Sequence, residues 1–308
     1  MAIKDLLNNY YYGKQGKRDF TVDDMPGTRR ELFGAVLKVR WSSMVVVNLM
    51  YLVIWLPAII WTFMNVAALN GILAQGVSLS SSEEAASLIT VWLIGMFPAV
   101  AITGPVNAGV TYVLRNWARD EHSFIWLDFK DAVKANWKQS LAVSTISGLM
   151  PVVLYTAVRF YSGLLKASPV FIVPVALVMM VGLLWSLSEM LMYPMLVTYS
   201  LKLKDVVRNS LLMTVGKLPH AVLFKLITLV LPVIAAVAAV AFPGASFYVL
   251  MAMVVLYGFF MLAFNKLVTV SYANWLCERY LNANIEGART DIGLRPKRRE
   301  DGEDAPND

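Results

Sequence analysis

Six long apolar stretches alternate along the chain with connections that carry nearly all of its positive charge on one side. Each stretch holds about 20 mainly apolar residues, which is enough to cross a bilayer as a helix. We predict spans at Met44–Ala67, Leu88–Leu114, Leu141–Leu165, Val170–Tyr199, Ala221–Phe242 and Phe247–Ala273. The pattern therefore predicts an all-α, polytopic membrane protein with six transmembrane helices.

The basic residues indicate how these spans are oriented. Of the 27 Lys and Arg residues, 23 lie in residues 1–40, 115–138, 202–217 and 279–308, whereas the three intervening connections hold only Lys166. Cytoplasmic connections are enriched in Lys and Arg, so we expect both termini in the cytoplasm and the basic segments facing anionic lipid. We divide the chain into a cytoplasmic segment (1–40), a transmembrane domain (41–275) and a cytoplasmic tail (276–308).

Composition and motifs exclude several classes of function. Hydrophobic residues make up 58% of the chain and charged residues 16%, which is too few charges for a typical soluble domain. The basic residues form no single patch, so we expect no nucleic-acid partner. No P-loop, HExxH or GxSxG motif occurs, and Cys277, His122 and His220 supply too few ligands in the wrong places for a metal site. We expect neither an enzyme nor a bound cofactor.

The two ends of the chain differ from its middle. Tyr10, Tyr11 and Tyr12 precede a segment punctuated by Gly and Pro, which predicts irregular structure near the membrane surface or in solvent. From Gly287 onward the chain is rich in charge, Gly and Pro and poor in large apolar residues. Such a composition predicts a largely disordered tail.

An internal repeat links the cytoplasmic connections. The segment 129–134 (FKDAVK) matches 203–208 (LKDVVR) at an offset of 74 residues, and 32–38 (LFGAVLK) is a weaker echo. Each segment precedes an odd-numbered span. We therefore predict three parallel repeats, each an amphipathic cytoplasmic helix followed by a membrane hairpin.

The second of these helices has a distinct apolar face. Trp126, Phe129, Val133 and Trp137 fall on one side at helical spacing, flanked by lysines. We expect this ledge to lie along the inner membrane surface. It serves either as a brace against the bundle or as a docking surface for a partner protein.

Four ionisable residues lie inside the predicted spans, where a charge costs about 2.5–3.5 kcal/mol unless it is paired, hydrated or close to an interface. Arg159 and Lys225 are near enough to span ends to reach the headgroups. Glu189 lies some ten residues, about 15 Å, from the inner end of its span, and Lys266 has a comparable depth. We predict that Glu189 pairs with Lys266 or Lys225, as a structural ion pair or as a substrate or proton site.

The second span contains a candidate helix break. Residues 103–109 (TGPVNAG) include Gly104, Pro105 and Gly109, and a break there frees backbone carbonyls that Asn107 or a ligand satisfies. Broken helices of this kind line binding sites in transporters. Small residues also permit close helix packing, which is the alternative explanation.

These residues together resemble the YesL-like family of bacterial integral membrane proteins. The resemblance covers roughly residues 30–275 and is carried by several short motifs: Leu32-Phe33, Asn48, Pro57, Gly104-Pro105, Tyr112-Val113-Leu114-Arg115, Trp126-Leu127-Asp128-Phe129, Lys134, Asn136 and Lys138-Gln139-Ser140. Genes of that family commonly accompany carbohydrate ABC importers in Gram-positive bacteria. The resemblance thus implies a role in oligosaccharide uptake, and it transfers no catalytic or binding residue.

Three classes of function follow. The first is an accessory subunit of a carbohydrate ABC importer in the bacterial cell membrane, which binds the permease subunits and through them an ATPase and a solute-binding protein. The second is a stand-alone sugar facilitator or secondary transporter that uses Glu189 and the break at Gly104–Gly109. The third is a membrane scaffold or signalling protein.

Overall fold

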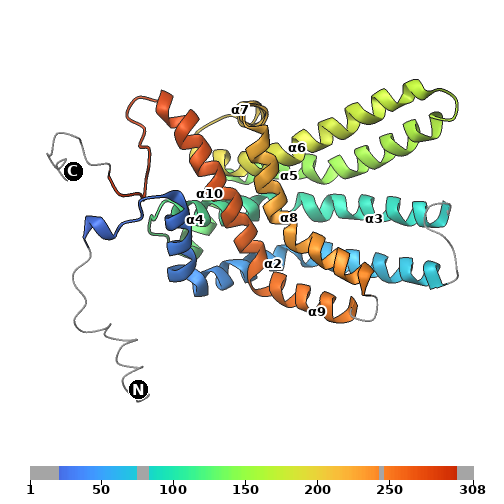
Figure 1. Cartoon of the computed structure of the whole chain (residues 1–308), viewed down its shortest axis with the longest axis horizontal. Coiled ribbons are helices and arrows are strands. Elements are labelled where there is room, and N and C mark those ends of the chain that lie inside the picture. Colours follow the sequence, from blue (N-terminus) through green and yellow to red (C-terminus); the bar gives the residue numbers. More distant parts are fainter. Residues whose placement is uncertain (1–20, 75–82, 243–245, 297–308) are drawn as a thin grey trace, which may run out of the picture.

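The computed structural model describes residues 21–74, 83–242 and 246–296, and within these ranges every regular element is a helix (Figure 1). The predicted all-α class is confirmed for this part of the chain. The tyrosine-rich segment at 10–12 lies outside the described residues.

The long helices cover the predicted spans. They are α2 (Arg29–Ala74), α3 (Glu83–Ala101), α4 (Gly104–Ala118), α5 (Ile125–Leu164), α6 (Ile172–Thr198), α7 (Leu203–Gly216), α8 (Leu218–Ala241), α9 (Ser246–Leu256) and α10 (Leu262–Tyr280). Helices α2 and α5 begin well before their predicted spans, and α7 lies outside the predicted spans. Short 3₁₀ turns lie at Val22–Asp24, Pro169–Phe171 and Asn282–Asn284, and a π-helical turn, η4 (Tyr257–Met261), joins α9 to α10.

Five of the described helical segments are long and apolar enough to cross a membrane, and the bent pair α3–α4 makes a sixth when counted as one span. The helices of a multi-pass membrane protein are therefore present. The helix pairs α2–α3, α5–α6 and α8–α9 extend toward the right of Figure 1, and the described ends of the chain lie on the left.

Helix α5 corrects the prediction of a separate amphipathic helix on the membrane surface. It runs for 40 residues without interruption, about 60 Å at 1.5 Å per residue, whereas the bilayer core is about 30 Å thick. Residues 126–138 are thus the first turns of the third span. Because they belong to the same helix as the span, they do not form the separate helix that was predicted.

The other two repeat segments join their spans differently. In α2 the backbone of Arg40 leaves the helical region (φ −108°, ψ 18°), so the segment 32–38 bends away from the first span. Helix α7 is separated from α8 by Lys217, which is also non-helical (φ −132°, ψ 38°). The three copies of the motif therefore join their spans in three different ways. The copy in α2 is followed by a kink, the copy in α5 by a continuous helix and the copy in α7 by a break.

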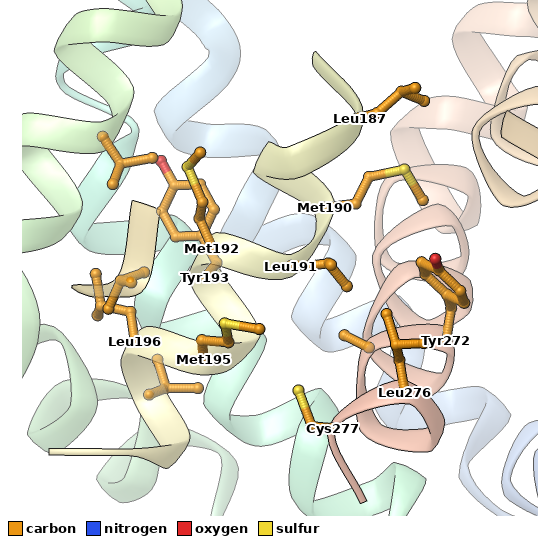
Figure 2. Close-up of a cluster of buried hydrophobic side chains, with 14 of the residues drawn as sticks. Leu187, Met190, Leu191, Met192, Tyr193, Met195, Leu196, Tyr272, Leu276 and Cys277 are labelled. Atoms are coloured by element: carbon orange, nitrogen blue, oxygen red, sulfur yellow. The ribbon is translucent and has the colours of Figure 1, made fainter. Parts of the chain in front are cut away.

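The core lies among α4, the second half of α6 and α10. Figure 2 shows the facing side chains of α6 and α10, including Leu191, Tyr272 and Leu276, which are all nearly or fully buried. By contrast, α8 and the outer halves of α5 and α6 expose most of their apolar side chains. Lipid is the solvent for such surfaces, so exposed apolar side chains around a partly polar interior are expected of a membrane protein.

The π-helical turn is held by a single buried side chain. Asn48 of α2 donates through Nδ2 to the carbonyl oxygens of Tyr257 (2.9 Å) and Gly258 (2.7 Å), and its Oδ1 accepts from the amide of Ala263 (3.0 Å). These are backbone groups that the π-turn leaves without regular α-helical partners. The irregularity in the sixth span therefore depends on the first span.

For residues 287–296 the structure differs from the predicted disorder. Arg295 donates its backbone amide to the carbonyl of Pro26 (2.8 Å) and its guanidinium approaches Asp23. Gly293 adopts a left-handed conformation (φ +80°) against the backbone of Arg119, where a side chain would clash. The polar composition suggested a free chain, but charged residues from distant segments hold it against the bundle. The rest of the tail lies outside the described residues.

Candidate functional site

The second span bends by 53° between α3 and α4, immediately before Gly104. Pro105 has no amide hydrogen, so the carbonyl of Ala101 lacks its helical donor. Ser144 of α5 supplies one instead, with its Oγ 2.5 Å from that oxygen. Gly104 packs so closely on α5 that a Cβ there would collide with the backbone of Ser140. The neighbouring helix thus satisfies the break without a ligand.

A buried polar cluster lies one turn further along α4. The Oδ1 atom of Asn107 accepts a hydrogen bond from Lys266 Nζ of α10 (3.3 Å) and one from the hydroxyl of Tyr51. The Lys266 ammonium group lies 4.5 Å from the ring centre of Tyr193. Helices α2, α4, α6 and α10 each contribute one of these residues, which we call the intramembrane cluster: Tyr51, Asn107, Tyr193 and Lys266.

The predicted ion pair of Glu189 takes a different form. No ion pair shorter than 4 Å joins Glu189 to Lys225 or Lys266 in the described part of the chain. Both Glu189 and Lys225 nevertheless lie close enough to Lys266 for their charges to act on it. Asn107 and the Tyr193 ring are the direct partners of the lysine. Four candidates from the sequence, Asn107, Glu189, Lys225 and Lys266, therefore lie in one region.

Not every buried polar group on these helices has a hydrogen-bond partner. Asn107 Oδ1 already accepts two hydrogen bonds, and its Nδ2 donates to Thr103 Oγ1 (3.2 Å). The buried hydroxyls of Tyr193 and Ser188 have no hydrogen-bond partner among the described residues. Unsatisfied polar groups are costly away from water, so the cluster is suited to hold water or a polar group. Tyr51 and Tyr193 were missed in the sequence because a tyrosine in a span reads as an apolar residue.

Arg159 lies near the far end of α5. Its guanidinium is 3.7 Å from the exposed carboxylate of Glu83 and lies over the Tyr155 ring at 5.9 Å. This half-exposed position is that of a side chain reaching the membrane surface. It is remote from the intramembrane cluster in sequence and in contacts.

The predicted ledge on α5 divides into two pairs of residues. Phe129 and Val133 pack against Gly109 of α4, whose missing side chain leaves room for them. Trp126 and Trp137 remain 67% and 47% exposed. The face therefore includes both a brace, formed by its centre, and an exposed aromatic surface, formed by its ends.

A pocket of about 630 Å³ lies on another side of the same helical segment. We call it the α5–α6 pocket. One wall is a stripe of α5, and the other is the end of α6 with the connection that follows it. Its lining residues are Tyr112, Asp128, Asp131, Ala132, Ala135, Asn136, Gln139 and residues 196–202. The α5 stripe recurs every three or four residues, but no property of the sequence shows that it faces a pocket.

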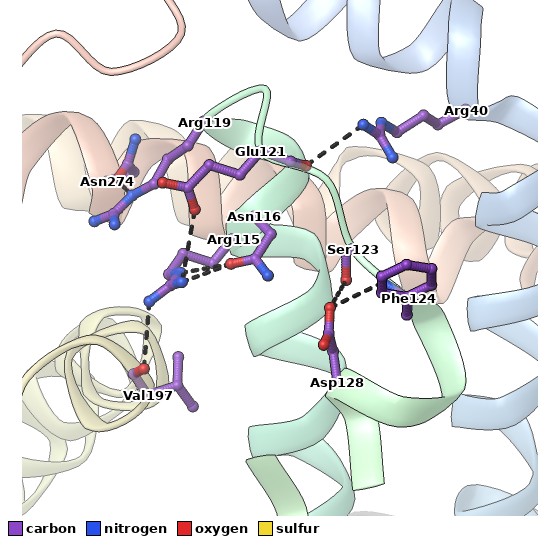
Figure 3. A network of polar contacts seen from close by, with 10 residues as sticks. All are labelled: Arg40, Arg115, Asn116, Arg119, Glu121, Ser123, Phe124, Asp128, Val197 and Asn274. Atoms are coloured by element: carbon purple, nitrogen blue, oxygen red, sulfur yellow. Dashed lines mark hydrogen bonds and ion pairs between the residues drawn. The ribbon is translucent and has the colours of Figure 1, made fainter. Parts of the chain in front are cut away.

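Charged side chains brace the adjoining end of α4 (Figure 3). Arg115 donates to Asn116 Oδ1 and to the carbonyl of Val197 in α6, and it lies 3.7 Å from Glu121. Arg119 donates to Asn274 Oδ1 of α10 (2.7 Å). These bonds tie α4 to both of its central neighbours. They fix the pocket rim next to Val197.

The described residues contain no group of three or more His, Cys, Asp and Glu side chains that could hold a metal ion. Each histidine instead contacts an aromatic ring, His122 that of Phe124 and His220 that of Trp275.

One family model matches part of the chain. The model described as "Protein of unknown function, DUF624" matches residues 44–158, from the first span through most of α5. No curated protein and no solved structure matches the chain.

Proposed function

We propose that the chain is an accessory integral-membrane subunit of a carbohydrate ABC importer and that it binds the permease subunits. Two observations support this. The first is the resemblance to YesL-like proteins, which are members of the DUF624 family whose model matches residues 44–158. The second, which carries the proposal, is the projecting start of α5 with its exposed Trp126 and Trp137. Exposed aromatic side chains on a rigid element are typical anchors of protein interfaces.

The proposal includes an orientation and an architecture. We base the orientation on the distribution of Lys and Arg, which favours cytoplasmic termini. With this orientation, the start of α5 lies on the side where a permease presents its cytoplasmic loops. Three parallel units are supported by packing: α5 packs on α4, α7 on α6, and the start of α2 on α10. Ala132 and Val206, equivalent at the 74-residue offset, are both buried.

The test is purification from native membranes in mild detergent. The permease pair is expected at near-equal amounts with the chain, and Trp126→Ala combined with Trp137→Ala is expected to reduce its recovery several-fold. Phe160→Ala, a change at a similarly exposed aromatic residue elsewhere on α5, serves as the control. Recovery of the chain alone counts against the proposal. Recovery with a soluble cytoplasmic protein instead favours the scaffold class.

The intramembrane cluster favours a second candidate, a stand-alone sugar transporter. In liposomes loaded with the purified chain, uptake of radiolabelled maltotriose that is abolished by Lys266→Met and by Glu189→Gln supports this class. Arg159 is the matched control, because Arg159→Met removes a cation that pairs with Glu83 at the far end of α5, and this variant is expected to leave the flux unchanged. If the wild-type chain produces no flux, this candidate is removed.

A further inference from the structure

The α5–α6 pocket is lined by more acidic than basic side chains. Two carboxylates line it, those of Asp128 and Asp131, against one cation, that of Lys202. One carboxylate oxygen of Asp128 already accepts two hydrogen bonds, since its Oδ2 accepts from Ser123 Oγ (2.7 Å) and from the amide of Phe124 (2.9 Å). Asp131 is exposed and makes no ion pair under 4 Å within the described ranges.

The two amide side chains of the pocket contribute acceptors as well. Asn136 Nδ2 donates to the carbonyl of Ala132 (2.9 Å), and Gln139 Nε2 donates to the carbonyl of Leu201 (3.2 Å). One amide hydrogen of each side chain is thereby engaged in an intramolecular bond. The amide oxygens are left to accept from a ligand.

The opposite wall adds backbone acceptors. Helix α6 ends at Thr198, and the last carbonyl groups of a helix have no partner within it. They also carry the negative end of the helix dipole, which attracts cations. Residues 196–198 of this last turn line the pocket. Both walls therefore present oxygen atoms with negative or partial negative charge.

The protein itself shows which group suits this site. The guanidinium of Arg115 lies 4.6 Å from the ring centre of Tyr112, a lining residue, and donates to the carbonyl of Val197 in the last turn of α6. One basic side chain is thus already bound at the rim by an aromatic face and a helix carbonyl. The pocket lining adds two carboxylates, those of Asp128 and Asp131.

We propose that the α5–α6 pocket binds an Arg or Lys side chain presented by a loop of a partner protein. The exposed positions of Asp131 and Ala135 let an extended loop enter from the surface without movement of the helices. The proposal rests on the proposed function in one respect only, that the partner is the permease. It assigns to the pocket the charge-specific part of a contact whose apolar part is the pair Trp126 and Trp137.

Binding is measured first with a defined probe, a fluorescently labelled Gly-Arg-Gly-Arg-Gly peptide, against the full chain in detergent. We expect the affinity for the peptide to fall as the salt concentration rises. The double substitution Asp128→Asn with Asp131→Asn is expected to lower this affinity at least about tenfold. Asp131→Asn alone, which leaves the contacts of Asp128 with Ser123 and Phe124 in place, is expected to show a smaller loss in the same direction. Ala135→Trp, which fills the pocket without changing charge, is also expected to abolish binding.

The repeat provides a matched control. Asp205 is equivalent to Asp131 at the 74-residue offset but lies in α7 and does not line the pocket. Asp205→Asn is expected to leave peptide binding unchanged. Equal losses in the Asp205 and Asp131 variants, or tighter binding of maltotriose than of the peptide, would overturn the proposal.

Recovery of the permease separates this inference from the proposed function. If the permease copurifies equally with wild type and with the Asp128/Asp131 variant, the pocket proposal fails and the importer role stands. If no permease copurifies but binding of the peptide is lost in the Asp131 and Ala135 variants, the importer role fails. The proposal that the pocket binds a basic side chain then stands.

Discussion

Replacing Arg29 by alanine is expected to lower the free energy of unfolding by about 3 kcal/mol, because it leaves a buried carboxylate without its counter-charge. Arg29 forms an ion pair with Glu278, whose side chain is only 5% exposed, and also donates to the carbonyl of Ile292 (2.7 Å). Glu278 accepts in addition from the amide of Asp291 (3.0 Å). Three segments far apart in the sequence therefore meet at this pair. The measurement is denaturation in mixed micelles, followed by tryptophan fluorescence.

A second substitution tests that mechanism. Arg29→Ala with Glu278→Leu removes both charges and is expected to recover part of the lost stability, since no unpaired charge remains. Arg30→Ala, at the exposed neighbouring position, is the control and is expected to change stability little. Equal losses in the Arg30 and Arg29 variants would show that the pair is not the cause.

Gly104→Val is expected to destabilise the bundle by about 1–3 kcal/mol through overpacking. A Cβ at this position would collide with the backbone carbonyl of Ser140 and with Ser144 Oγ, and a backbone atom cannot move aside by changing rotamer. The same shift would disturb the bond from Ser144 to the free carbonyl of Ala101. Loss of monodisperse protein on heating in detergent measures the effect.

Gly163 offers the matched control, because no atom lies within 4 Å of the place where its Cβ would be. Gly163→Val introduces the same side chain into a helix without the collision. A Gly104→Val variant as heat-stable as Gly163→Val would mean that α4 and α5 do not approach as closely as described.

The two candidate functions make separate demands on the structure. An accessory subunit requires surfaces for a partner, which the start of α5 and the α5–α6 pocket provide. A transporter requires a path through the bundle, for which the intramembrane cluster provides polar groups. The cluster also has a structural explanation, because Lys266 joins α10 to α4 and α6 through Asn107 and the Tyr193 ring. Glu189→Gln and Lys266→Met distinguish the two roles of the cluster. Loss of flux in a stable variant indicates a transport role, and loss of stability indicates a structural role.

The spans and the break before α4 could be predicted from the sequence because they depend on local properties. A run of apolar residues is favourable in lipid whatever lies next to it, and Pro105 removes a helical donor in any context. The proximity of Glu189 and Lys266 was foreseen only as a shared depth in the membrane. The direct partner of Lys266 could not be predicted, because the sequence gives no reason to prefer Asn107 over Glu189.

The packing of the start of α5 could not be predicted from its own sequence. Its amphipathic pattern is correct in detail, yet the same pattern fits a helix lying on a membrane and a helix packed on α4. Only Gly109, 20 residues earlier, decides that Phe129 and Val133 turn inward. The ordering of residues 287–296 depends likewise on Asp23, Pro26 and Arg29 at the opposite end of the chain.

The amino-acid sequence alone predicts lipid as the solvent, six crossings and the side on which the basic connections lie, because hydropathy and charge act residue by residue. Tertiary structure alone decides which polar groups meet, where a pocket remains and which apolar face is covered. Those outcomes depend on contacts between residues that are distant in the chain, and close packing admits only one of the many pairings that the local patterns allow.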